Sequence, residues 1–128
     1  MKKFLLLAIN SKYIHSNLAV RCLKKAATPY EELVSVVEYS INNRTEDILK
    51  GIYLEKPDVL GFSCYIWNIE VVKELIFEIN KLMPQLPIWL GGPEVSYNPM
   101  DYIENYPITG VMCGEVELVF NRLFTDYV

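Results

Sequence analysis

The residues best suited to chemistry gather in four short segments of the 128-residue chain, each directly after a stretch of apolar residues. The first segment contains the single histidine, His15, and the third contains the pair Gly91-Gly92. Tyr65 and Trp67 lie in the second segment and offer flat apolar surfaces. The four segments span residues 10–17, 63–68, 91–97 and 113–117.

Several kinds of chemistry are disfavoured by these segments. A phosphate-binding loop needs glycines whose N–H groups approach the anion, and residues 10–17 contain none. A phosphate-accepting receiver domain would place acidic residues where Asn10 and Ser63 stand. Cys22, Cys64 and Cys113 form no Cys-x-x-Cys pair, so neither a dithiol redox site nor a zinc site is expected. No nucleophile–base pair suggests a catalytic centre within this chain.

Short apolar stretches alternate with helical patterns along the whole chain. The stretch Phe4–Ile9 is typical of a strand that is buried on both faces. Strands are predicted at residues 4–9, 32–39, 58–63, 87–90 and 108–113, and helices from 16 or 17 to 25, after 43, over 72–83, at 100–105 and at 115–124. Asn43 and Glu46 resemble a capping box, and Ile48, Ile52 and Tyr53 are expected on one buried helix face.

This alternation predicts an α/β fold, a three-layer flavodoxin-like (Rossmann-like) parallel five-stranded sheet of order 2-1-3-4-5. We expect residues 1–128 to form a single domain. In such a sheet, ligands bind beyond the carboxyl ends of the strands, where all four segments would meet.

Composition narrows the class of protein further. Apolar residues make up 52% of the chain and charged residues 22%, which excludes a disordered protein. The net charge of −4 argues against a nucleic-acid partner and against an anionic membrane surface. The apolar stretch after Met1 is too short for a signal peptide, and three separated cysteines suit a reducing cytoplasm.

The loops resemble the cobalamin-binding domain at the amino terminus of B12-binding radical SAM proteins. That family has Asp-x-His-x-x-Gly, then Ser-x-Leu, then Gly-Gly, and here His15, Ser63-Cys64-Tyr65 and Gly91-Gly92 follow the same order. About forty-four residues separate Leu18 from Ser63, and about twenty-five separate Tyr65 from Gly91, as in the family. Gly114-Glu115-Val116-Glu117 is similar to the Gly-Glu-Gly-Glu that closes the domain.

The resemblance implies that the corrin lies at the carboxyl edge of the sheet, with its nucleotide tail near Ser63 and Gly91-Gly92. His15 would ligate cobalt or pack beside the corrin; the Asp and Gly that flank the histidine in the family are replaced by Tyr13 and Leu18. The cofactor-binding residues implied are His15, Ser63, Tyr65, Trp67, Gly91, Gly92, Gly114 and Glu115.

Each of these residues also has a purely structural interpretation. Ser63 would cap a turn, the two glycines would form a tight turn, and Gly114 with Glu115 would begin the last helix. Tyr65 and Trp67 would equally face a neighbouring domain.

The family's iron–sulfur cluster and S-adenosylmethionine would belong to a downstream radical SAM domain, because this chain lacks the Cys-x-x-x-Cys-x-x-Cys motif. The resemblance therefore implies a non-catalytic amino-terminal fragment of a methyltransferase-like protein. The alternative is a cofactor-free flavodoxin-like module that docks a neighbouring domain.

Overall fold

The computed structural model describes residues 3–10 and 33–112 of the chain. The elements are β1 (Phe4–Asn10), β2 (Val34–Ser40), α2 (Thr45–Glu55), β3 (Val59–Ser63), α3 (Ile69–Leu82), β4 (Ile88–Gly91), α4 (Pro93–Ser96), α5 (Pro99–Asn105) and β5 (Gly110–Val111). The helices predicted at 16 or 17 to 25 and at 115–124 lie outside the described residues.

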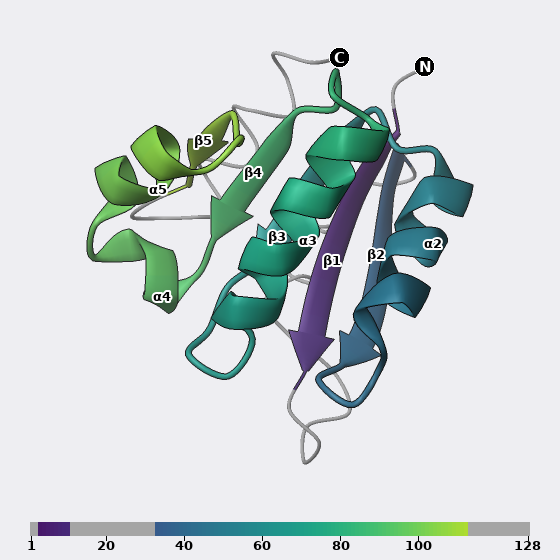
Figure 1. The fold of residues 1–128 in the computed structure, drawn as a ribbon, viewed down its shortest axis with the longest axis horizontal. Coiled ribbons are helices and arrows are strands. Elements are labelled where there is room, and N and C mark those ends of the chain that lie inside the picture. Colours follow the sequence, from purple (N-terminus) through teal and green to yellow (C-terminus); the bar gives the residue numbers. More distant parts are fainter. Residues whose placement is uncertain (1–2, 11–32, 113–128) are drawn as a thin grey trace.

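The strands form one parallel sheet in the order β2-β1-β3-β4-β5 (Figure 1). This confirms the predicted flavodoxin-like order. The chain runs from β1 outward to β2 and then returns across β1 to place β3 on its other side. The point at which the order reverses therefore lies between β1 and β3, and their carboxyl ends define the expected ligand edge.

One face of the sheet packs against α2 and α3, which lie side by side across it (Figure 1). The apolar residues of α3 recur at steps of three and four, so they form one buried stripe along the helix. The core on this face is made of alternate strand residues and the inner faces of the helices: Leu5, Leu7, Ile9, Ile48, Ile52, Leu60, Phe62, Cys64, Ile69, Val72, Leu75, Ile76, Ile79, Ile88, Leu90 and Val95.

The opposite face carries the other half of each strand. Side chains alternate between the two faces of a strand, so every second residue of β1 and β3 points away from α2 and α3. A second apolar cluster forms there from Phe4, Leu6, Ala8, Val34, Val59 and Met112. Both faces of β1 are thus buried, as its continuous apolar sequence predicts.

Two local predictions are wrong. Asn43 does not cap α2: the helix begins after Arg44, and the Asn43 Oδ1 instead accepts a hydrogen bond from the Ser40 amide at 2.7 Å. Tyr53 is 52% exposed rather than part of the buried face, because Ile48 and Ile52 already fill the space between α2 and the sheet. The structure also adds α4, which the sequence pattern did not predict, and shortens the fifth strand to two residues.

Within residues 3–10 and 33–112, no helix combines the length and the apolar character that crossing a bilayer requires.

The packing of α3 gives a first testable prediction. Ile76→Ala removes a fully buried side chain and should lower the free energy of unfolding by about 2–5 kcal/mol, because the surrounding core cannot close the cavity. Leu82→Ala, at a half-exposed position on the same helix, should change it by less than about 0.5 kcal/mol. Urea unfolding followed by circular dichroism measures both values, and equal losses would contradict this packing.

Candidate functional site

The turns that follow β3 and β4 lie against each other at the carboxyl edge of the sheet. The Cys64 amide donates a hydrogen bond to the Gly91 carbonyl at 2.7 Å, and the Glu94 amide contacts the Cys64 carbonyl at 3.4 Å. The structure therefore brings together Ser63, at the end of β3, and Gly91-Gly92, at the end of β4. The sequence predicted this proximity from the shared edge.

The backbone of the neighbouring β3 turn explains why residue 92 is a glycine. Its φ is +106°, a conformation that L side chains rarely adopt, and a Cβ there would lie 2.5 Å from the Cys64 carbonyl oxygen. The close approach of the β3 turn is thus sufficient to require glycine at this position. This geometry supports the tight-turn interpretation of Gly92, and a contact of Gly92 with the cofactor stays a prediction.

Gly91 differs from its neighbour. A Cβ at Gly91 would lie 3.4 Å from the Met112 methyl group, an ordinary contact with the flexible end of a side chain. The backbone geometry does not demand glycine at this position, which leaves room for the explanation that a ligand approaches there.

A row of small residues crosses the sheet near its carboxyl edge. In register, Ala8 of β1 lies beside Ser63 of β3, and Ser63 lies beside Gly91 of β4. Phe62 and Leu90 belong to the core facing α2 and α3, so Ser63 and Gly91 point to the opposite face. In this small-residue row (Ala8, Ser63 and Gly91) the side chains are short across three adjacent strands, and all three residues are buried.

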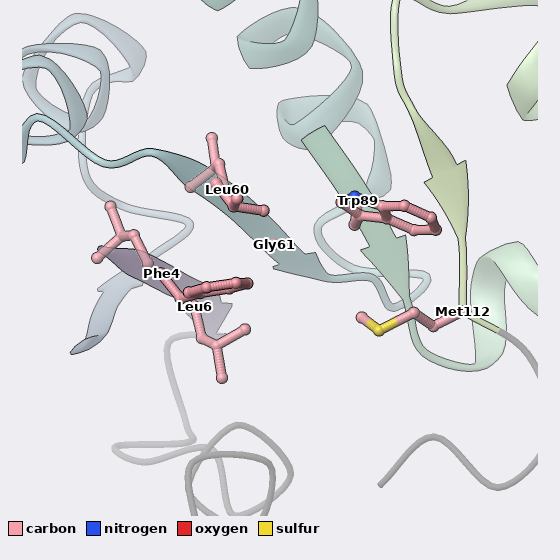
Figure 2. Close-up of a pocket in the computed structure, with 8 residues that line it drawn as sticks. Phe4, Leu6, Leu60, Gly61, Trp89 and Met112 are labelled. Atoms are coloured by element: carbon pink, nitrogen blue, oxygen red, sulfur yellow. The ribbon is translucent and has the colours of Figure 1, made fainter. Parts of the chain in front are cut away.

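On the same face, the row two residues earlier in each strand contains a hollow. Gly61 of β3 lies between Leu6 and Trp89 in register. Figure 2 shows that the indole of Trp89 runs toward β5 and away from Gly61. A Cβ on Gly110 would be 2.5 Å from the ring, so Gly110 makes room for the indole.

The hollow itself is small. It is lined by Phe4, Leu5, Leu6, Val59, Leu60, Gly61, Trp89 and Met112. Its volume of about 10 Å³ corresponds to roughly one water molecule. A group larger than a water molecule would enter the hollow only if lining side chains moved.

Asn68 is a functional candidate that sequence reasoning missed. It is 0% exposed. Its Nδ2 donates to the carbonyls of Ile9 and Ser63, both at 3.0 Å, and its Oδ1 accepts from the Tyr65 amide at 2.8 Å. An asparagine between a strand and a helix was a visible signal, but only the fold shows that its side chain joins the ends of β1 and β3.

Tyr65 and Trp67 form a parallel stack on this turn. Their ring centroids are 4.5 Å apart and their planes differ by 3°. The Trp67 Nε1 donates to the Ile9 carbonyl at 3.2 Å, which fixes one edge of the indole to β1. Trp67 remains 37% exposed, so a flat apolar surface is presented at the ligand edge.

Cys64 lies between Ser63 and Tyr65 but belongs to the core, as predicted for a small unreactive residue. Burial raises the pKa of its thiol to about 12; the hydrogen bond with the Gly91 backbone lowers the pKa and the charge of Glu94 raises it, both to a smaller extent. The raised pKa and the burial both favour the neutral thiol at physiological pH.

The other predicted site residues lie outside the described part of the chain: His15, Gly114 and Glu115. Also outside it are Cys22 and Cys113. Among the described residues, no three His, Cys, Asp or Glu side chains gather in a way that could hold a metal ion.

The fold and this edge define a flavodoxin-like α/β domain of the class that binds ligands beyond the carboxyl ends of its strands. A family model described as the B12 binding domain matches residues 5–124. The chain belongs to this family.

Curated relatives share part of the sequence. The chain is 33% identical over 69 residues to the cobalamin-dependent radical SAM methyltransferase TokK of Streptomyces tokunonensis, a match that covers 53% of this chain and 10% of TokK. It is 32% identical over 71 residues to the 2-(S-pantetheinyl)-carbapenam-3-carboxylate methyltransferase of Streptantibioticus cattleyicolor, which covers 55% of this chain and 10% of that protein. The matches thus span about a tenth of the length of these relatives.

A solved structure shares the fold. The cobalamin-dependent S-adenosylmethionine radical enzyme OxsB superposes with a TM-score of 0.73 at 16% sequence identity. The superposition covers 99% of this chain and 19% of OxsB.

The structure requires glycine at position 92 but not at position 91, and this difference can be tested. Gly92→Ala should lower the free energy of unfolding by about 2 kcal/mol or more, because a Cβ both strains the backbone and overlaps the Cys64 carbonyl. Gly91→Ala, the matched change one residue earlier, should cost less than about 1 kcal/mol. Urea denaturation of both variants measures the difference, and a Gly92→Ala variant as stable as Gly91→Ala would contradict the geometry.

The raised pKa of Cys64 gives a labelling prediction. At pH 8, iodoacetamide should leave Cys64 unmodified in the folded chain, because the buried thiol with a pKa of about 12 supplies almost no thiolate. The same reagent should modify Cys64 in urea. Peptide mapping by mass spectrometry follows this one cysteine, and rapid labelling in the folded chain would show that the site is open.

Proposed function

We propose that this chain holds cobalamin as the B12-binding domain of a radical SAM methyltransferase-like protein. Membership of the B12 binding domain family supports the cofactor, and the two curated relatives support the type of protein. The observation that carries the proposed position of the cofactor is the small-residue row at the carboxyl edge. It coincides with the Ser63 and Gly91 positions that the family pattern assigns to the nucleotide tail.

The row suits a flat group lying against the sheet. Ala8, Ser63 and Gly91 carry only short side chains over three adjacent strands, and the Ser63 hydroxyl provides a hydrogen-bonding group among them. Because all three residues are buried, the tail would bind only where the row becomes uncovered. The nucleotide tail would lie along this row. Because the neighbouring hollow holds only about 10 Å³, a base that extended into it would displace Met112 or other lining side chains.

The stacked Tyr65 and Trp67 suit the macrocycle. A corrin presents a large, mostly apolar edge and face, and binding sites for such ligands use flat apolar walls with few polar groups. The stack lies on the turn that follows Ser63, so one turn would contact both the ring and the tail. His15, Gly114 and Glu115 keep their proposed roles, with His15 as a cobalt ligand or a neighbour of the corrin.

The chemistry would belong to the complete protein. When bound, the cofactor supplies a cobalt that carries out methyl transfer or assists a radical reaction, while the protein orients it and excludes water. We propose that the chain is an amino-terminal module and that the iron–sulfur cluster and S-adenosylmethionine belong to a downstream domain, its main partner. The separated cysteines and the net charge of −4 support a cytoplasmic protein that binds neither nucleic acid nor membranes.

A desalting experiment tests the proposal. The purified 128-residue chain is incubated with hydroxocobalamin and desalted, and the retained corrin is measured by its visible absorbance. Ser63→Leu should reduce retention about tenfold or more, because a large side chain fills the small-residue row. Ser35→Leu, the same substitution on β2, should retain cobalamin like the unaltered chain.

Two results would contradict the proposal. If both leucine variants retained equal amounts of cobalamin, the nucleotide tail would not lie along the small-residue row. A colourless unaltered chain would favour the alternative, a cofactor-free module that docks a neighbouring domain. The exposed Ile66 and Tyr97 near the same edge would then be the first residues to test for that contact.

A further inference from the structure

The side chain of Asn68 does not do what its position in the sequence suggests. It occupies the N-cap position of α3, where asparagine commonly accepts a hydrogen bond from the first turn of the helix. No such bond forms. Its Oδ1 turns back along the chain and accepts from the Tyr65 amide at 2.8 Å, so the side chain stabilises the turn before the helix instead of the helix itself.

The amide nitrogen of Asn68 joins two strands at the point where the sheet order reverses. The register between β1 and β3 ends at the pair Ala8 and Ser63. Beyond that pair, the Asn68 Nδ2 donates to Ile9 of β1 and to Ser63 of β3, both at 3.0 Å. A buried carbonyl without a partner is costly, so this bridge supplies hydrogen bonds where the β1–β3 ladder has ended.

The Asn68 side chain is also linked by hydrogen bonds to both residues of the aromatic stack. Asn68 fixes the backbone of Tyr65 directly, and the Ile9 carbonyl that it contacts also accepts from the Trp67 Nε1 at 3.2 Å. Ile66, between the two aromatic residues, is 78% exposed. Cys64, at the start of the turn, packs in the core, and the hydrogen bonds around Asn68 help to set the shape of the rest of the turn.

We infer that Asn68 is a positioning residue for the corrin: it holds the turn 64–68 so that Tyr65 and Trp67 form a preformed flat wall. This inference rests on the proposed function. Asn68 contacts no ligand in this scheme. It acts through the turn, by keeping the competent arrangement populated before the ligand arrives, and a ligand that had to order the turn itself would bind more weakly.

Two substitutions separate this role from simple folding. Asn68→Asp keeps an acceptor for the Tyr65 amide but sets a carboxylate against the carbonyls of Ile9 and Ser63. Asn68→Ser adds no charge and is too short to span both carbonyls. Asn80→Asp, at an exposed position on the same helix, is the matched control. All are made in a Trp89→Phe background, so that Trp67 is the remaining tryptophan.

The first readout uses the chain without ligand. Both Asn68 variants should shift the Trp67 fluorescence to longer wavelength and increase its quenching by acrylamide, whereas Asn80→Asp should change neither. A role limited to overall stability would lower the melting temperature and leave the emission of the folded chain unchanged. That result would overturn the inference.

The second readout is the affinity for hydroxocobalamin, titrated by visible absorbance. Each Asn68 variant should bind about tenfold more weakly or worse, as expected if the turn is competent only about a tenth of the time. Equal affinities in the parent, the control and the Asn68 variants would overturn the positioning role and leave the proposed function intact. A parent chain that binds no corrin would instead overturn the proposed function.

A measurement on the unaltered chain covers the case in which both Asn68 variants fail to fold. The Tyr65 amide, bonded to the buried Asn68 Oδ1, should exchange with deuterium slowly despite its place in a turn. Exchange as fast as that of an exposed loop amide would overturn the inference, because it would show that Asn68 does not hold the turn.

Discussion

The end of the β1–β3 ladder at the carboxyl edge is the constraint on which this edge of the molecule depends. The paired register stops at Ala8 and Ser63, and the buried backbone beyond it still needs hydrogen-bond partners. The Asn68 amide supplies two of them, and its oxygen fixes the Tyr65 amide. One asparagine therefore joins the two strands and fixes the backbone at Tyr65.

The two faces of the sheet differ in the size of their side chains and in the role that we assign to them. The face toward α2 and α3 is filled by large aliphatic side chains that stabilise the domain. The opposite face combines an apolar cluster with the small-residue row of Ala8, Ser63 and Gly91. Strand alternation makes this division possible, since a residue that serves the site need not serve the helical core. The proposed cofactor position uses the part of this face where the side chains are short.

The fold was largely predictable because its signals are local. Periodic apolar residues revealed α3, continuous apolar stretches revealed the strands, and the alternation of the two predicted the strand order. The predictions were wrong where another contact in the fold took the place of the one that the local pattern indicated. Asn43 had the spacing of a capping box, but its side chain bonds the Ser40 amide, and Tyr53 lay beside a helix face that Ile48 and Ile52 already occupied.

The sequence by itself determined the class of fold, the family pattern and the edge at which Ser63, Tyr65, Trp67 and Gly91-Gly92 gather. Only the tertiary structure decided that Gly92 accommodates the Cys64 backbone, that Ala8 aligns with Ser63 and Gly91, and that Asn68 bridges two strands. The physical reason is distance along the chain. Strand register and contacts between remote backbones depend on how all the elements pack together, and no local pattern of residues specifies them.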